Sequence, residues 1–274
     1  MPSFVTSDGL NLYYEESGEG LPLLCLAGLT RTTRDFDYVA PYLDGVRLIR
    51  MDYRGRGQSD WDPDWINYNL PVECRDVLEL LAHLGLTQVA ILGTSRGGLN
   101  AMGLASVAPD ALLGVALNDI GPVIETEGID FIMGYLGRNP SATSYEDIAR
   151  ATAKTMRGFD DVSHERWLEE AHKHYTATPD GMHITYDPKL RDAVQAAGHQ
   201  VTPDLWPYFD AVPDCPIALI WGENSDLLKE TTVREMQKRR PELILAKVPN
   251  RGHIPFLDEP ESRVALNTWL DALR

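Results

Sequence analysis

Apolar and polar residues follow one another along this chain in a pattern that predicts its secondary structure. Continuous apolar runs are typical of strands that are buried on both faces, and they occur at residues 21–28, 46–52, 88–93 and 112–119. Residues 68–86 instead place apolar side chains at positions i, i+3, i+4 and i+7, which predicts a helix. Because strand and helix alternate in this region, we expect a mostly parallel sheet covered by helices on both faces.

The alternation stops in the middle of the chain and returns near the C-terminus. Residues 215–222 and 242–249 are typical of two further strands, and a helix is expected between them near residues 231–240. Pro260 lies in the first turn of a predicted last helix. The interruption contains three amphipathic stretches and no convincing apolar strand; these stretches are residues 145–156, 163–175 and 188–199.

This organisation predicts one α/β domain with an insertion. We expect residues 1–120 and 211–274 to form a doubly wound core, and residues 121–210 to form a helical cap, or lid. A length of 274 residues agrees with a single large domain of this kind.

Charge and composition narrow the classes of partner. The formal net charge of −16 disfavours nucleic acids and anionic membrane surfaces, so a small-molecule partner is expected, and the oligomeric state is left open. No apolar run approaches the roughly 18 residues of a membrane span, and no signal peptide is visible at the N-terminus. Cys25, Cys74 and Cys215 are scattered without metal-binding spacing, which indicates free thiols. A cytoplasmic protein is the simplest expectation.

Ser95 stands in a pattern that suits a nucleophile. The segment GTSRG, residues 93–97, has the form G-x-S-x-G between a predicted strand and a predicted helix. A sharp turn at this place needs small neighbours and exposes the serine hydroxyl at a helix N-terminus, where the amide of Arg96 can stabilise an oxyanion. A packing turn with an idle serine would give the same five residues, so the catalytic interpretation depends on partners.

Candidate partners follow two later strands. Asp226 lies in the segment GENSDLL and His253 in the segment NRGHIPF, and each comes directly after a predicted strand. With Ser95 they give the chain order Ser, Asp, His of one type of catalytic triad. Asp119, at the end of the strand before the insertion, is the alternative acid, and we expect Asp226 to be the acid that orients His253.

At this point the chain resembles the α/β-hydrolase family over nearly its whole length. The three segments around Ser95, Asp226 and His253 resemble the family's nucleophile, acid and histidine loops, and DYRGRGQSD, residues 52–60, matches its D-x-R-G-x-G-x-S stretch. The resemblance implies a backbone oxyanion hole formed by the NH groups of Leu29 and Arg96. The family commonly has histidine at the position of Ala27, so the bracing of this loop differs here, and Thr30 or Arg31 is a candidate replacement.

A serine nucleophile implies acyl transfer to water. We expect a carboxylesterase or lactonase that cleaves a small or medium hydrophobic ester, without a cofactor or a metal ion. A hydrolase of C–C bonds in diketone-type substrates and a non-catalytic ligand-binding module remain alternatives. The pair His172 and His174 lacks a third ligand and is expected on a solvated helix face with Lys173.

Specificity is expected to come from the insertion. Its apolar and aromatic side chains are candidates for lining the pocket, and they are Phe131, Met133, Tyr135, Trp167 and Trp206. Four arginines of the insertion either bind a substrate carboxylate or form surface ion pairs; they are Arg138, Arg150, Arg157 and Arg166.

Overall fold

The computed structural model, which describes residues 2–198 and 204–274, contains a central eight-stranded sheet with the order β1-β2-β4-β3-β5-β6-β9-β10. Each pair of neighbouring strands from β4 to β10 is parallel, whereas β2 pairs antiparallel with both of its neighbours, β1 and β4. The mostly parallel α/β sheet expected from the sequence is confirmed. The strands are β1 (Ser3–Val5), β2 (Asn11–Ser17), β3 (Leu21–Leu26), β4 (Val46–Met51), β5 (Val89–Thr94), β6 (Leu112–Asn118), β9 (Ile217–Gly222) and β10 (Ile244–Val248).

Both faces of the sheet are buried, and β3 illustrates how. Leu24 and Leu26 belong to a core that includes apolar residues of α1 (Leu70–His83), α2 (Arg96–Val107) and α8 (Glu230–Arg239). Leu23 and Cys25 belong to a second core, with α9 (Pro260–Ala272). Because successive side chains of a strand point to opposite faces, a continuous apolar run is required for a strand between two helix layers.

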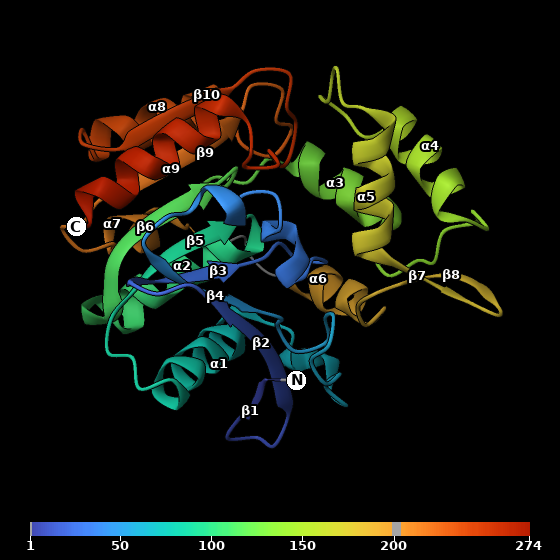
Figure 1. Cartoon of the computed structure of the whole chain (residues 1–274), viewed down its shortest axis with the longest axis horizontal. Helices are drawn as coiled ribbons and strands as arrows, with labels where there is room; N and C mark the ends of the chain where they lie inside the picture. Colours follow the sequence, from blue (N-terminus) through green and yellow to red (C-terminus); the bar gives the residue numbers. More distant parts are fainter. Residues whose placement is uncertain (1, 199–203) are drawn as a thin grey trace.

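Residues 121–210 contribute mainly helices, which lie beside the sheet in Figure 1. Ser163 illustrates how one of them begins, because its hydroxyl accepts a hydrogen bond from the amide of Arg166 at 3.2 Å. A short hairpin, absent from the sequence prediction, also occurs here. The elements are α3 (Thr126–Tyr135), α4 (Tyr145–Thr155), α5 (His164–His174), β7 (Tyr175–Thr178), β8 (Gly181–Ile184), α6 (Leu190–Gly198) and α7 (Trp206–Asp210).

The middle and the C-terminal end of this segment differ in their packing. α4 and α5 lie with the hairpin away from the sheet (Figure 1). Phe209 of α7, by contrast, is fully buried in the core that α1, α2 and α8 share. Residues 199–203 of the expected insertion lie outside the described residues. They include residue 199, the last residue of the third predicted helix.

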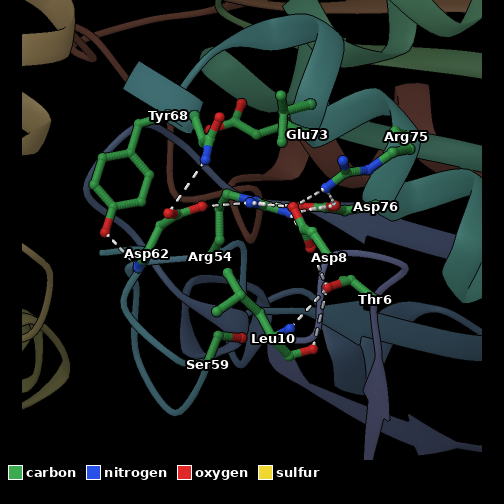
Figure 2. A network of polar contacts seen from close by, with 12 residues as sticks. Thr6, Asp8, Leu10, Arg54, Ser59, Asp62, Tyr68, Glu73, Arg75 and Asp76 are labelled. Carbon is green, nitrogen blue, oxygen red and sulfur yellow. Dashed lines mark hydrogen bonds and ion pairs between the residues drawn. The ribbon is translucent and has the colours of Figure 1, made fainter. Parts of the chain in front are cut away.

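A buried ion cluster fixes the loop after β4. Figure 2 shows Arg54 between carboxylates from three separate segments. Its Nε and Nη2 atoms donate to both oxygens of Asp76 on α1 at 2.6 and 2.7 Å, and its side chain also pairs with Asp62 and Asp8. The Arg54 side chain is completely buried, so its removal leaves acidic groups in a medium of low polarity.

We expect Arg54→Met to lower the free energy of unfolding by about 3–5 kcal/mol, because it breaks buried pairs from one side only. Urea denaturation monitored by circular dichroism measures this change. Arg150→Met is the control, since Arg150 is 58% exposed and, among the residues that the structure describes, pairs only with Glu146 and Asp147 on its own helix. Its loss should cost no more than about 1 kcal/mol, and equal effects of the two substitutions would contradict the assignment.

Candidate active site

Ser95 lies at the turn between β5 and α2, in a backbone conformation that side chains rarely adopt. Its φ and ψ are 49° and −113°. A Cβ atom at Gly93 would lie 2.5 Å from the carbonyl oxygen of Gly97, and a Cβ atom at Gly97 would collide with the carbonyl oxygen of Leu26. Only glycine therefore fits at both flanking positions, and the close packing of α2 against the sheet forces the strained turn at Ser95.

A chain of hydrogen bonds connects Ser95 to a buried carboxylate. The distance from Ser95 Oγ to His253 Nε2 is 2.9 Å, and the distance from His253 Nδ1 to Asp119 Oδ2 is 2.8 Å. A carboxylate can only accept, so Nδ1 carries the hydrogen and Nε2 is free to accept from the serine hydroxyl. Asp119 is fully buried, and its carboxylate also accepts hydrogen bonds from the amide of Gly222 at 2.8 Å and the hydroxyl of Ser225 at 2.6 Å.

The expectation that Asp226 would pair with His253 is wrong. Asp119 immediately follows β6, and its carboxylate accepts from the amide of Gly222 at the end of β9 and lies 2.8 Å from Nδ1 of His253. The loop after β9 therefore supports the Asp119 carboxylate instead of contacting His253 through Asp226. Ser225 of that loop reaches the Asp119 carboxylate, while the neighbouring Asp226 lines the cavity beside Ser95.

The two amides expected to stabilise an oxyanion belong to segments next to Ser95. Arg96 is the first residue of α2, so its NH group has no acceptor within the helix. Leu29 lines the same cavity as Ser95, and its amide donates to no acceptor within residues 2–198 and 204–274. The Ala27 side chain, at the position where the family commonly has histidine, is fully buried in the sheet core.

A buried carboxylate links these two segments. Glu73 of α1 is 2.7 Å from Nε of Arg96 through one oxygen and 2.9 Å from Nη2 of Arg56 through the other. Arg56, which is fully buried, donates from Nε to the carbonyl oxygen of Leu29 at 2.9 Å. Burial alone would raise the pKa of Glu73, but Arg96 and Arg56 lower it to about 2, so the group is ionised at neutral pH. The sequence gives a signal for this link only in the second arginine of DYRGRGQSD.

A cavity of about 40 Å³, partly open to solvent, lies over Ser95 and His253. Residues of the sheet domain and of the segment between β6 and β9 both contribute. The lining residues are Gly28, Leu29, Thr30, Arg31, Ser95, Gly128, Phe131, Ile132, Tyr135, Met156, Arg157, Asp226, His253 and Ile254.

Two of the five expected pocket residues, Phe131 and Tyr135, line this cavity, and Met133, Trp167 and Trp206 do not. Ile132, Met156 and Ile254 also line the cavity and are not among the expected residues, because a single apolar side chain has no local signal that distinguishes a cavity wall from the core.

The three residues that do not reach the cavity pack elsewhere for identifiable reasons. Met133 lies on another side of α3 and packs against a small cluster around Leu136. Trp167 is buried edge-on against Phe256, with ring centroids 6.0 Å apart. Trp206 packs against Phe209 at the margin of the sheet core. Each is a large side chain used for packing.

The expected solvated face at His172, Lys173 and His174 is also wrong in part. His172 is exposed, but Lys173 is buried, and Nε2 of His174 lies 2.8 Å from Nη1 of Arg31. α5 packs this face against the loop after β3. Nowhere in the described residues do three or more histidine, cysteine or acidic side chains gather in a way that could hold a metal ion.

Two further expectations concern helices and thiols. Among the helices of the described ranges, none combines the length and apolar character that crossing a membrane requires. Cys25, Cys74 and Cys215 are free cysteines, and the first two are buried.

Comparison with known proteins identifies the family. Residues 22–260 match the model of the α/β-hydrolase fold. The 3-hydroxybutyrate-oligomer hydrolase of Cupriavidus necator is 34% identical over 89% of this chain and 86% of its own, and the 2-(acetamidomethylene)succinate hydrolase of Mesorhizobium japonicum is 26% identical over 96% and 92%. A crystal structure of an α/β hydrolase from Novosphingobium aromaticivorans has 35% identity and a TM-score of 0.92, and covers 99% of this chain and 97% of its own. With this fold, this family match and these relatives, the chain belongs to the α/β-hydrolase family.

Proposed function

We propose that this protein is a serine hydrolase that cleaves a small carboxylic ester through an acyl-enzyme. The observation that carries the proposal is the hydrogen-bonded chain from Ser95 through His253 to Asp119, with distances of 2.9 and 2.8 Å. A serine hydroxyl is a weak nucleophile unless an oriented base removes its proton, and this arrangement supplies both the base and the group that orients it.

The reaction follows from the positions of these groups. His253 Nε2 takes the proton of Ser95 as Oγ attacks the ester carbonyl carbon, and the imidazolium formed is stabilised by the Asp119 carboxylate. The amides of Leu29 and Arg96 stabilise the negative charge on the carbonyl oxygen. His253 then gives its proton to the leaving alcohol, and a water molecule activated by the same imidazole releases the acid.

The relatives suggest the type of substrate. The names of the two enzymes from Cupriavidus necator and Mesorhizobium japonicum specify hydroxybutyrate oligomers and a substituted succinate, both of which are small carboxylic acids. At 34% identity over most of both chains, the first relative favours a short hydroxyacid ester for this protein. We propose such an ester as the substrate, and the segment between β6 and β9 as the lid that selects it.

A fluorophosphonate probe tests the proposed nucleophile. We expect one equivalent of probe to bind covalently to Ser95, as mapped by mass spectrometry of the digested protein. The rate of hydrolysis of p-nitrophenyl acetate and butyrate should fall in proportion to the fraction of enzyme that is labelled. Such probes react with serines that an adjacent base activates. Labelling of another residue, or none at all, would be incompatible with the proposal.

Glu73→Gln should lower kcat by about 10–100-fold while KM changes less. The variant has no charge to hold Arg56 and Arg96, so the two segments that carry the oxyanion amides lose their common anchor. Complete loss of one oxyanion donor costs about 10²–10³-fold, which sets the upper limit. The measurement is steady-state hydrolysis of p-nitrophenyl butyrate at neutral pH.

Glu79→Gln is the matched control for Glu73→Gln. Glu79 lies on the same helix, is partly exposed and pairs with Arg75 away from the cavity. It should leave kcat unchanged. If Glu73→Gln lowers only the urea midpoint and retains wild-type kcat and KM, Glu73 has a purely structural role.

A further inference from the structure

The cavity contains an arginine that lies beside the proposed nucleophile. Arg31 lies in the loop after β3, and its side chain is 24% exposed. A Cβ atom added to Gly28 would lie 3.5 Å from Cγ of Arg31 and 3.8 Å from Cβ of Ser95, so the two side chains flank the same glycine. Both residues line the cavity. The Arg31 side chain is therefore part of the wall that a bound substrate contacts.

In the described part of the chain, protein groups hold one nitrogen of this guanidinium, Nη1. Nη1 lies 3.2 Å from Asp35, 3.1 Å from Glu170 and 2.8 Å from Nε2 of His174. Within the described residues, neither Nε nor Nη2 of Arg31 donates to an acceptor, and neither belongs to the buried atoms that lack partners, so both are accessible. The N–H bonds of Nε and Nη2 are parallel and match the two oxygens of a carboxylate.

The groups around Nη1 fix this open edge in position. Asp35 and Glu170 are almost completely buried, and Lys173, also buried, lies 3.9 Å from the second oxygen of Glu170. The carboxylates of Asp35 and Glu170 thus face the cationic side chains of Arg31 and Lys173. Burial would lower the pKa of Arg31, but Asp35 and Glu170 raise it above its ordinary value. The cluster offers an anion a pre-oriented pair of donors rather than an excess of positive charge.

We propose that the Nε and Nη2 edge of Arg31 binds a carboxylate of the substrate, so that the site takes esters with a free carboxylate near the scissile bond. This inference rests on the proposed function, since the carboxylate and the reacting ester share one cavity. The wall formed by Phe131, Ile132 and Met156 suits the short aliphatic part between them. The competing interpretation is that Arg31 only anchors α5 through its ion pairs.

Binding to the Ser95→Ala variant, which cannot form an acyl-enzyme, tests the proposal. The ligands are the linear dimer of 3-hydroxybutyrate and the methyl ester of the same dimer, which differ only in the free carboxylate. Isothermal titration calorimetry should give a dissociation constant at least tenfold lower for the acid than for the methyl ester. Equal affinities would overturn the proposal.

A second substitution assigns the difference to Arg31. In the Ser95→Ala background, Arg31→Met should remove the preference for the acid while the methyl ester binds as before. Arg34→Met is the control, because Arg34 lies in the same segment, is half exposed and binds the carbonyl oxygen of His172 outside the cavity. It should retain the preference. An equal loss of both ligands in Arg31→Met, with a lowered urea midpoint, supports the anchoring role and overturns the proposal.

Turnover by the wild-type enzyme separates this inference from the proposed function. If the acid binds through Arg31 but neither dimer is hydrolysed and Ser95 takes no fluorophosphonate, the proposed function fails and carboxylate binding stands. If both dimers are hydrolysed with equal kcat/KM, the hydrolase stands and the carboxylate site fails.

Discussion

Ser95→Ala should lower kcat for p-nitrophenyl butyrate by about 10⁶-fold, the loss seen when a serine hydrolase loses its nucleophile. Without Oγ, no acyl-enzyme forms, and only the oxyanion amides and the cavity remain to assist attack by water. The residual rate is measured with purified enzyme from the product that accumulates over long incubations. The same variant should show no covalent fluorophosphonate adduct.

Ser144→Ala is a suitable control for Ser95→Ala. Ser144 caps α4 by accepting a hydrogen bond from the amide of Asp147 at 3.1 Å, and α4 carries no residue of the cavity lining. Its loss should cost about 1 kcal/mol in stability and nothing in kcat. Residual activity of Ser95→Ala above about 1% of the wild-type value, after contaminating esterases are excluded by immunodepletion, would contradict the role of Ser95 as nucleophile.

The strands of the sheet were predictable because their signal is local. β3, β5 and β6 are almost entirely apolar, β4 interrupts its apolar residues only with Arg47 and Arg50, and the structure has each strand within two residues of the predicted bounds. A strand between two helix layers is apolar at most positions, so its sequence alone indicates it. The hairpin β7–β8 has no clear signal in the sequence because each strand has only four residues and neither forms a continuous apolar run.

Features that depend on distant contacts were predicted less well. Lys173 was expected in solvent because its neighbours on α5 are charged, but it packs against the ring of Tyr38, with Nζ 3.1 Å from the ring centroid. Phe209 falls within the range expected for the insertion and is buried in the sheet core instead. In both cases the partner is far away in the sequence, and local periodicity contains no information about it.

The candidate site shows the same division. The turn at Ser95 and the loop of His253 have local signals, namely two obligatory glycines and a position after a strand. The choice between Asp119 and Asp226 depends on contacts between loops that are distant in the sequence, since the amide of Gly222 and the hydroxyl of Ser225 hold the Asp119 carboxylate against His253. The link from Glu73 to Arg56 and Arg96 has little local signal either, since it joins α1 to the loop after β4 and to the first residue of α2 through side chains that are distant in the sequence.

Asp119→Asn should lower kcat by about 10⁴-fold and leave the fold intact. The asparagine amide would face Nδ1 of His253 and favour the tautomer with hydrogen on Nε2, which cannot accept the Ser95 proton. Asparagine tolerates the φ of 53° at this position, and its oxygen can still accept from the amide of Gly222. Circular dichroism and steady-state kinetics, with NMR of the His253 ring nitrogens, measure both effects.

Asp226→Asn provides the decisive contrast, because Asp226 was the acid expected from the sequence. Its side chain lies in the cavity wall and makes no hydrogen bond to His253 within the described part of the chain. The substitution should change kcat less than tenfold, with any effect falling on KM. A 10⁴-fold loss in Asp226→Asn together with near-normal turnover in Asp119→Asn would return the acid to the loop after β9. Large losses of kcat in both variants would indicate that the two carboxylates act together. The function of His253 would then depend on the whole loop after β9, which Ser225 connects to Asp119.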